Sequence, residues 1–461
     1  MGQSSIEYDY AGASSLAAGS EGARLSLATS GGSDASGAVS HPYFFSGFAE
    51  HPGVVAAGLL MLARVARTRF YVPPNTLAAV LRAADPVVTS SPDGLRFESF
   101  SVCCGVYARL DVDAVALDTA YAASGVTNVD VNPPLRQALA GLRPSEPLHL
   151  GVGDDELRVS TFDHEIVEER VPLPARWLKG FGETQTLSAG MTLRHELTGP
   201  AVRQFVQGLP RSSATKTVMW ATQAARTLRL ASRPSRGAVC VAGPERLRVL
   251  EPLLRFATSL RAYGPDADAS SLPAPSAWVL ELPGARVTVG LSPEKARGFS
   301  GEGAVLHALA GADGAGDADL LGALLAFEPR IDIPLLSQTA GLSESRVRGG
   351  LAALASQGLV GYDLHTGAFF HRPLPVRPEL LGMLHPRLAD ARMLADAGSV
   401  RRGADGRFVV DSGGTPYEVA LAADPVDDRC TCPWRAKHRG TRGPCKHVLA
   451  ARLVAGDRER G

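Results

Sequence analysis

The sequence lacks the features that would place the protein in a membrane or surround it with a field of one sign. Its longest apolar run, residues 54–62, is soon followed by Arg64 and is far shorter than the ~20 residues that span a bilayer. The N-terminus has neither a basic region nor an apolar core, so we expect no signal peptide. Acidic and basic residues number 47 each, so no net charge recruits nucleic acid. Any such contact must be local.

Lysine is also scarce, with five residues among the 47 basic side chains. The chain is at the same time rich in alanine, glycine and proline, and this combination indicates the coding bias of a GC-rich genome. The preference for arginine therefore does not by itself indicate phosphate binding. A length of 461 residues suggests about three domains, which is ample for buried cores.

Three of the six cysteines lie within sixteen residues near the C-terminus, in the pattern Cys430-x-Cys432, twelve intervening residues, then Cys445-x-His447. In extended backbone, residues i and i+2 point to the same side, so the first pair can present two sulfurs to one ion. The amphipathic run 448–454 predicts a helix that places Cys445 at its entrance and His447 in its first turn. Three thiolates and one imidazole form a closed tetrahedral set, which suits one structural Zn²⁺.

Two alternatives to this ligand set remain open. A disulfide could join two of the three cysteines, although Cys430 and Cys432 are too close in sequence to bridge well. His438, in the loop, could replace His447 as the fourth ligand. The negative charge of a three-thiolate site would be offset by the basic residues around it, with no intervening acid, namely Arg429, Arg435, Lys437, Arg439, Arg442 and Lys446.

This segment resembles the SWIM zinc finger, whose pattern is Cys-x-Cys, a variable loop and Cys-x-His. The preceding residues match the hairpin of that family, with strands at 407–410 and 417–421 around a turn at 411–414. The resemblance covers about 55 residues. It implies zinc, a ββα fold and binding to DNA or to protein, without choosing between the two.

More broadly, the chain resembles bacterial SWIM zinc finger family proteins, in which a long N-terminal region precedes the finger. This wider resemblance implies a protein partner, with AAA-type ATPases or von Willebrand A-type proteins as the expected class. The other cysteines, Cys103, Cys104 and Cys240, sit among apolar residues and predict reduced core side chains. Free thiols together with a thiolate zinc site favour the cytoplasm.

The pattern of the whole chain predicts a multidomain α+β protein. We expect a flexible arm over 1–40 with one early strand that pairs elsewhere, α+β domains over 41–180 and 181–310, a winged-helix-like module over 318–375 and the finger over 400–461. The first domain should contain a buried helix at 52–67 and a second helix at 76–84. In the second domain, Pro244 should open a helix that Pro252 kinks or breaks. Residues 311–319 read as a flexible junction.

The winged-helix-like module is predicted from a helix at 333–342 that ends in a glycine turn, a helix at 344–358 and a hairpin around 365–367. If it binds DNA, the second helix enters the major groove and presents Arg346 and Arg348. The wing would add His365 or Arg372. Such modules also serve as protein-docking or structural units, and Gly349-Gly350 weakens this helix by up to ~1 kcal/mol per glycine.

No local motif assembles a catalytic nucleophile, base and orienting group. The segment His164–Glu168 lacks the second histidine of a zinc protease helix, and neither a phosphate-binding loop nor a nucleophile elbow is present. The short acidic groups Asp111-Val-Asp113 and 154–156 predict surface turns rather than metal sites.

We therefore expect a non-enzymatic, zinc-binding scaffold or adaptor that presents its finger to a protein partner. The alternative is a DNA-binding regulator that uses the winged helix and the basic finger. Its candidate contacts are Arg346 and Arg348 on the helix and, in the finger, Trp434, Arg435, Lys437, Arg439, Arg442 and Lys446. Trp434 could equally pack in the small core of the finger.

Overall fold

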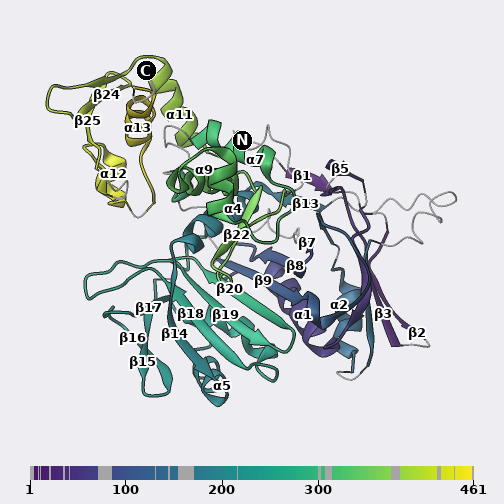
Figure 1. Cartoon of the computed structure of the whole chain (residues 1–461). Coiled ribbons are helices and arrows are strands. Elements are labelled where there is room, and N and C mark those ends of the chain that lie inside the picture. The colour runs from purple at the N-terminus through teal and green to yellow at the C-terminus, as the bar shows by residue number, and fades with distance from the viewer. Residues whose placement is uncertain are drawn as a thin grey trace.

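The computed structural model (Figure 1) describes the chain except residues 1–4, 9, 11, 20–21, 35–36, 41, 71–85, 130, 144–145, 154–170, 215, 300–302, 307–313, 375–384, 423–426, 441 and 459–461. Helices and sheets both contribute extensively, so the predicted α+β class is confirmed. The helix expected at 76–84, the acidic group 154–156 and the segment His164–Glu168 lie outside the described residues. Within the described part, no helix combines the length and apolar character needed to cross a bilayer.

The largest sheet has ten strands, and every neighbouring pair in it is antiparallel. The strands are β4 (Gly32–Asp34), β5 (Gly37–Val39), β7 (Val87–Ser91), β8 (Gly94–Phe100), β9 (Val106–Asp113), β11 (Gly125–Asn128), β14 (Thr192–Thr198), β18 (Ser259–Gly264), β19 (Ser276–Leu282) and β20 (Ala285–Leu291). Their order is β14-β18-β19-β20-β9-β8-β7-β11-β4-β5. Because β9 pairs with β20, the ranges 41–180 and 181–310 share one sheet.

A second sheet of five strands includes much of the expected N-terminal arm. Its strands are β2 (Ser15–Gly19), β3 (Gly22–Leu27), β6 (Phe45–Ala49), β10 (Leu117–Ala122) and β12 (Leu148–Val152), in the order β10-β6-β12-β3-β2. Leu25 and Leu27 of β3 are buried in the main core. The strands β2 and β3 pair with each other, and β3 also pairs in parallel with β12, which lies far along the chain. Near it, β1 (Ser5–Tyr8) pairs with β13 (Val171–Pro174).

Helices cover both faces of the centre of the large sheet. On one face lies α1 (Pro52–Arg67), which has the predicted bounds and is buried along most of its length. Gly58 lets this helix approach β9, since a Cβ there would lie 2.7 Å from Leu110 Cδ2. On the other face, α4 (Ala175–Ala189) packs Trp177 and Phe181 against Phe100. Residues 106–112 of β9 are all buried, and the charged side chains among them, Arg109 and Asp111, form ion pairs.

The described residues of the body also form a short 3-10 helix, η1 (Ala114–Ala116), further helices and a small sheet. The helices are α2 (Pro133–Gly141), α5 (Pro200–Gln207) and η2 (Pro244–Leu253), and the sheet has the order β16-β15-β17 with β15 (Val218–Ala224), β16 (Thr227–Ala231) and β17 (Val239–Ala242). The segment η2 is a 3-10 helix rather than the kinked α-helix expected from Pro244 and Pro252. It still buries its leucines in the main core.

A compact helical module follows the body. It consists of α7 (Gly314–Leu324), α8 (Ile333–Ala340), α9 (Glu344–Ser356) and the hairpin β21 (Val360–Asp363) and β22 (Ala368–His371). The helix α7 begins inside the segment expected to be a flexible junction. Side-chain caps agree with the sequence, since Ser343 accepts a hydrogen bond from the amide of Arg346. The C-terminal half of α9 is buried and packs against α7 and α4, so the module is fastened to the body.

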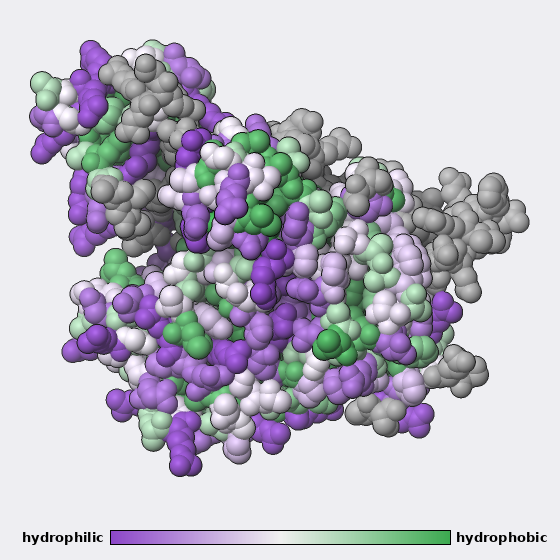
Figure 2. All heavy atoms as spheres, in the orientation of Figure 1, coloured by the Kyte–Doolittle hydropathy of each residue, from purple (hydrophilic) through white to green (hydrophobic). Residues whose placement is uncertain are grey.

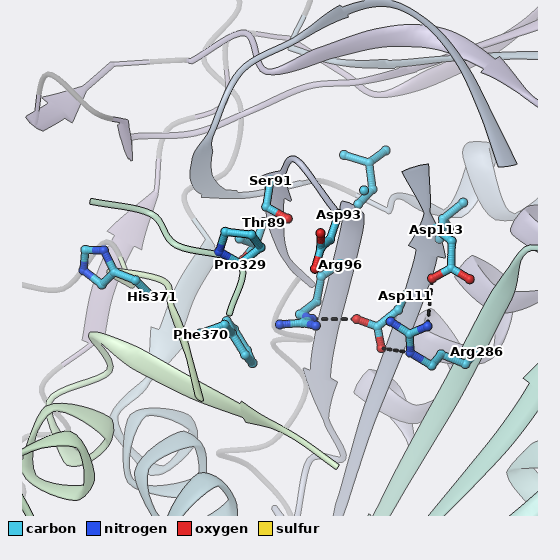
Figure 3. A pocket seen from close by; sticks show the side chains of 13 residues that line it. Thr89, Ser91, Asp93, Arg96, Asp111, Asp113, Arg286, Pro329, Phe370 and His371 are labelled. Carbon is cyan, nitrogen blue, oxygen red and sulfur yellow. Dashed lines mark hydrogen bonds and ion pairs between the residues drawn. The ribbon is translucent and has the colours of Figure 1, made fainter. Parts of the chain in front are cut away.

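Buried ion pairs attach the β21–β22 hairpin to the large sheet. Figure 3 shows the sheet side of this attachment, where Arg96 and Arg286 contact Asp111 and Phe370 of β22 lies beside Arg96. Asp363 at the end of β21 accepts hydrogen bonds from Arg109 at 2.8 Å and from Arg96 at 3.0 Å. The same two arginines bind Asp111, at 2.8 and 2.6 Å. Asp111 was expected in a surface turn, but it is 4% exposed and lies in the centre of β9. We name Arg96, Arg109, Asp111, Arg286 and Asp363 the hairpin-docking network.

A second buried pair strengthens this attachment. Arg372, just after β22, is fully buried and forms an ion pair with Glu98 of β8. Tyr107 donates a further hydrogen bond to Glu98 at 2.5 Å. Burial raises the pKa of Tyr107, and so does the adjacent carboxylate, so the phenol stays a donor. Arg372 was a candidate wing contact to DNA, and its burial removes it from that role.

Candidate metal centre

The C-terminal residues form a small unit with a core of its own. Its sheet has the order β23-β24-β25-β26, with β23 (Val400–Arg402), β24 (Phe408–Ser412), β25 (Thr415–Ala420) and β26 (Arg429–Cys430), and its helices are α11 (Pro386–Asp396), α12 (Pro433–His438) and α13 (Lys446–Arg458). The β24–β25 hairpin and the helix α13 lie where the sequence predicted them. The short helix α12 was not predicted. It occupies the loop between the two ligand pairs.

The four predicted ligands converge in this unit. One ligand atom from each of Cys430, Cys432, Cys445 and His447 lies within 4.8 Å of the others. His447 Nδ1 is 3.8 Å from Cys430 Sγ. In a tetrahedral zinc site, a sulfur and a nitrogen ligand are about 3.6 Å apart, so the cluster needs little adjustment to close around one ion. The donor set therefore fits zinc.

Local structure explains how the four side chains come together. Cys430 ends β26, whereas Cys432 is the N-cap of α12, so the first pair is a strand end and a helix start rather than one continuous strand. Cys445 directly precedes α13, which carries His447 in its first turn. The amides of Arg435 and Val448 each donate to a cysteine sulfur at 3.5 Å. Such N–H···S bonds favour thiolates at both helix starts.

Hydrogen bonds among the three sulfurs shift the pKa values of the thiols in opposite directions. The bond to Cys430 and then the bond to Cys445 lower the pKa of Cys432, while bonds to Cys432 and Cys445 raise the pKa of Cys430. Binding a divalent cation displaces protons from the thiols, since the metal ligand is the deprotonated sulfur.

The fourth ligand is His447 rather than His438. The imidazole of His447 is 5% exposed and stacks on Tyr417 with ring centroids 4.3 Å apart, which fixes the ring plane. His438 ends α12 and packs on Trp434, with ring centroids also 4.3 Å apart, and it is not in the ligand cluster. The absence of a disulfide among the cysteines of the described chain agrees with the metal interpretation.

A model of the SWIM zinc finger family matches residues 415–455, which hold the hairpin strand β25, all four ligands and most of α13. The C-terminal unit is a SWIM zinc finger. No curated protein matches the chain by sequence. A solved structure of proliferating cellular nuclear antigen from Entamoeba histolytica is similar over 54% of this chain and 99% of that chain, with 10% identity and a TM-score of 0.33. A likeness at that level supports no conclusion about fold or function.

The finger is joined to the body by residues that the sequence did not single out. Val305 and Leu306 are buried in its core, although they precede the helical module in the chain. The amide of Ala304 donates to Glu183 of α4 at 2.9 Å. Arg387 at the start of α11 donates to the carbonyl oxygens of Arg442 and Pro444, at 2.7 and 2.8 Å. A local sequence pattern does not reveal this junction, because residues 303–306 are far along the chain from the cysteines of the finger.

Trp434 has a structural position in the SWIM finger. Its ring lies under two guanidinium groups, with the centroid 4.8 Å from Arg387 and 5.8 Å from Arg442, and His438 packs on it as well. Among the finger's basic candidates, Lys437 and Arg439 are exposed, whereas Arg435, Arg442 and Lys446 are half-buried. Lys446 Nζ lies 4.0 Å from Asp390.

The candidates on α9 make ion pairs within the helical module. Arg346 forms two hydrogen bonds to Asp317 of α7, at 2.7 and 3.0 Å. Arg348 lies 3.5 Å from Glu344 on the exposed side of α9. At the hairpin, His365 contacts Glu281 of the large sheet at 3.1 Å. The structure brings the four metal ligands together. Arg346, Arg348 and His365 lie outside the finger and make the contacts just described instead.

Proposed function

We propose that the protein is a non-enzymatic adaptor in which one structural zinc ion holds the finger in a binding-competent shape. The closed ligand set supports this most directly, because three thiolates and an imidazole leave no coordination position for a substrate. Cys432 and Cys445 are 1% and 2% exposed and His447 is buried, whereas Cys430 is half-buried. When bound, zinc cross-links β26 and the starts of α12 and α13. Its role is to supply folding free energy.

The chemistry of the finger surface suggests an acidic protein as its partner. Between Asp428 and Asp457 the chain carries no acidic residue. Lys437 and Arg439 are exposed on and beside α12, and hydrophilic residues follow the outer rim of the finger in Figure 2. A basic surface of this kind selects a partner by charge complementarity. The resemblance to bacterial SWIM proteins makes an AAA-type ATPase or a von Willebrand A-type protein the expected class, in a reducing cytoplasm.

The second candidate function is a DNA-binding regulator. The succession of α7, α8, α9 and the β21–β22 hairpin supports a winged-helix module, whose second helix would carry Arg346 and Arg348 toward DNA. Three observations weigh against this use of the module. Arg346 is paired with Asp317, Arg372 is buried against Glu98, and the hairpin is attached to the large sheet. We therefore rank the adaptor first.

The test is affinity purification of the tagged full-length chain from its native host, with and without nuclease. The adaptor predicts an acidic protein partner that survives nuclease and is lost from a Lys437→Glu, Arg439→Glu variant. Arg401→Glu, an exposed arginine on β23 of the same finger, is the matched control and should retain the partner. If the control variant lost the partner to the same extent, the α12 surface would not be the site that binds the partner.

A titration with duplex DNA separates the two candidates directly. Phosphate contacts release counterions, so a DNA-binding regulator would lose affinity steeply as salt rises. The adaptor predicts no retention of discrete DNA fragments after purification. If defined fragments co-purify and are lost on replacing Arg346, the regulator replaces the adaptor.

A further inference from the structure

A long segment of the body is free of acidic residues, although the chain as a whole is balanced. From Leu197 to Pro244 there is no aspartate or glutamate, while seven basic side chains are present: Arg203, Arg211, Lys216, Arg226, Arg229, Arg233 and Arg236. This segment forms α5 and the sheet β16-β15-β17, at the lower left of Figure 1, whereas the finger is at the upper left. Its charge is therefore a separate feature from the basic finger.

Three of these arginines gather around one pocket. The pocket has a volume of about 460 Å³ and is lined by residues of β14, β15 and β16 and by the loop before β17. Arg229, Arg233 and Arg236 contribute to its wall, and no carboxylate does. All three side chains are exposed, and within the described residues none of them has an ion pair or hydrogen bond. Like charges close together in one concavity repel each other, and a bound anion offsets this repulsion.

The interior of the pocket adds polar groups that lack partners. Thr222 Oγ1 and His195 Nε2 are buried and have no hydrogen-bond partner among the described residues. Thr222 of β15 lies directly opposite Arg229 of β16, so both side chains project from the same face of the hairpin. Burial lowers the pKa of His195 and outweighs the backbone hydrogen bonds to Ala221 and Gly237, which act in the opposite direction. Buried polar atoms without partners are uncommon in folded proteins and point to a ligand or water.

We propose that this pocket binds the phosphate group of a small molecule. Guanidinium groups match phosphate oxygens with paired N–H donors, and the Thr222 hydroxyl supplies another donor from within. The three guanidinium charges exceed the two negative charges of a phosphate dianion, so the bound anion would be fully compensated. The volume leaves room for part of an organic group beside the phosphate. A nucleic acid backbone would need basic residues spaced along a track, whereas these converge on one concavity.

The experiment is calorimetric titration of the full-length, zinc-loaded chain with inorganic phosphate and with a nucleoside monophosphate, at constant ionic strength. The variants Arg229→Gln with Arg236→Gln, and separately Thr222→Val, should weaken phosphate binding by roughly tenfold or more. Arg226→Gln is the matched control, because Arg226 is an exposed arginine in the turn of the same hairpin and does not line the pocket. It should leave binding within about twofold.

The two ligands distinguish the source of the phosphate. Tighter binding of the monophosphate than of inorganic phosphate would identify a phosphate ester, and the reverse would identify the free ion. The proposal fails if neither ligand binds, or if the Arg226→Gln control weakens binding as much as the pocket variants. It also fails if a 20-base-pair duplex binds more tightly than both and depends equally on Arg226 and Arg229, which would indicate an extended nucleic acid surface.

Discussion

The zinc site and the hairpin-docking network are two clusters of buried polar groups with opposite relations to the sequence. The ligands of the first lie between Cys430 and His447, within one small unit. The members of the second are drawn from β8, β9, β20 and β21, between Arg96 and Asp363. A local cluster can be read from residue spacing because short chain geometry brings its members together. A distributed cluster exists only after the strands have paired.

The two clusters also stabilise the molecule by different means. A metal ion bound to thiolates supplies free energy directly, since the site does not exist in the unfolded chain. A buried ion network must first repay the desolvation of its charges, so its net contribution is small while it is complete. The removal of one member leaves an uncompensated buried charge. We therefore expect loss of a metal ligand to unfold the finger and loss of a network carboxylate to weaken the hairpin attachment.

The largest expected effect follows replacement of a zinc ligand. Cys445→Ser should abolish zinc binding and unfold the finger while the body stays folded, because the small core draws most of its stability from the metal. The measurements are zinc content by mass spectrometry and limited proteolysis of residues 400–458. Cys103→Ser, a cysteine outside the cluster, is the control and should keep the zinc content of the original chain. Retention of zinc by Cys445→Ser would refute the ligand assignment.

Replacement of the network carboxylate should have the next largest effect. Asp363→Ala leaves Arg96 and Arg109 with Asp111 as their one shared carboxylate in the network, so buried positive charge is uncompensated, and should cost about 3–5 kcal/mol of hairpin attachment. Hydrogen exchange of the β21 and β22 amides measures this loss locally. Asp266→Ala, which removes the exposed partner of Arg194, should cost no more than about 1 kcal/mol. Equal effects of the two changes would show that burial does not distinguish them.

The same carboxylates should make the attachment sensitive to acid. Burial alone would raise the pKa of Asp363, but Arg109, Arg96 and Arg286 outweigh it and lower the pKa well below its ordinary value. The pKa of Asp111 is lowered by the same kind of balance, with Arg109 and Arg96 overcoming burial. A lowered pKa in the folded state gives stability that is present above the ordinary value, about 4, and is lost as the pH falls below it.

This acid sensitivity can be assigned to the network by comparing variants. Urea unfolding of the body should show a falling midpoint below about pH 4, and the fall should be shallower in Asp363→Ala, which lacks one of the two carboxylates. An identical pH dependence in both chains would place the responsible groups elsewhere.

The smallest expected effect concerns the helical module. Arg346→Ala removes a bidentate pair with Asp317, but the arginine side chain is 46% exposed, so solvent screens the pair. We expect a loss of about 0.5–1 kcal/mol. Arg348→Ala, whose partner Glu344 is itself exposed, should change stability by less than about 0.5 kcal/mol. Urea unfolding of both variants measures the two losses of stability. If either variant lost more stability than Asp363→Ala, burial would not determine the size of the effect.

The finger and the helix α1 are two features that local sequence patterns predicted. The spacing of Cys430, Cys432, Cys445 and His447 predicted the zinc ligands, and the apolar run after Pro52 predicted α1 with its exact bounds. In both, the residues that interact are a few turns or one loop apart. The resemblance to the SWIM finger rested on the same local spacing and is confirmed over 415–455.

The sequence did not predict features that depend on contacts between segments far apart in the chain. Residues 1–40 were expected to be a flexible arm with one early strand, and the structure pairs β3 with β2 and with β12, which is far along the chain. Asp111 was expected in a surface turn, because the sequence does not show that Arg96 and Asp363, from other strands, join it and the nearby Arg109. Asp363 itself carried no signal at all, since a single aspartate at a strand end is ordinary.

The sequence by itself determined the α+β class, the zinc ligands and the hairpin and helix that hold them, because coordination geometry and helix periodicity act over short stretches of chain. Only the tertiary structure decided that β9 and β20 join two expected domains into one sheet, and that β21 and β22 are buried against it. It also decided that three arginines surround one pocket. These outcomes depend on strand pairing and charge compensation between remote residues, and neither leaves a periodic pattern in the chain.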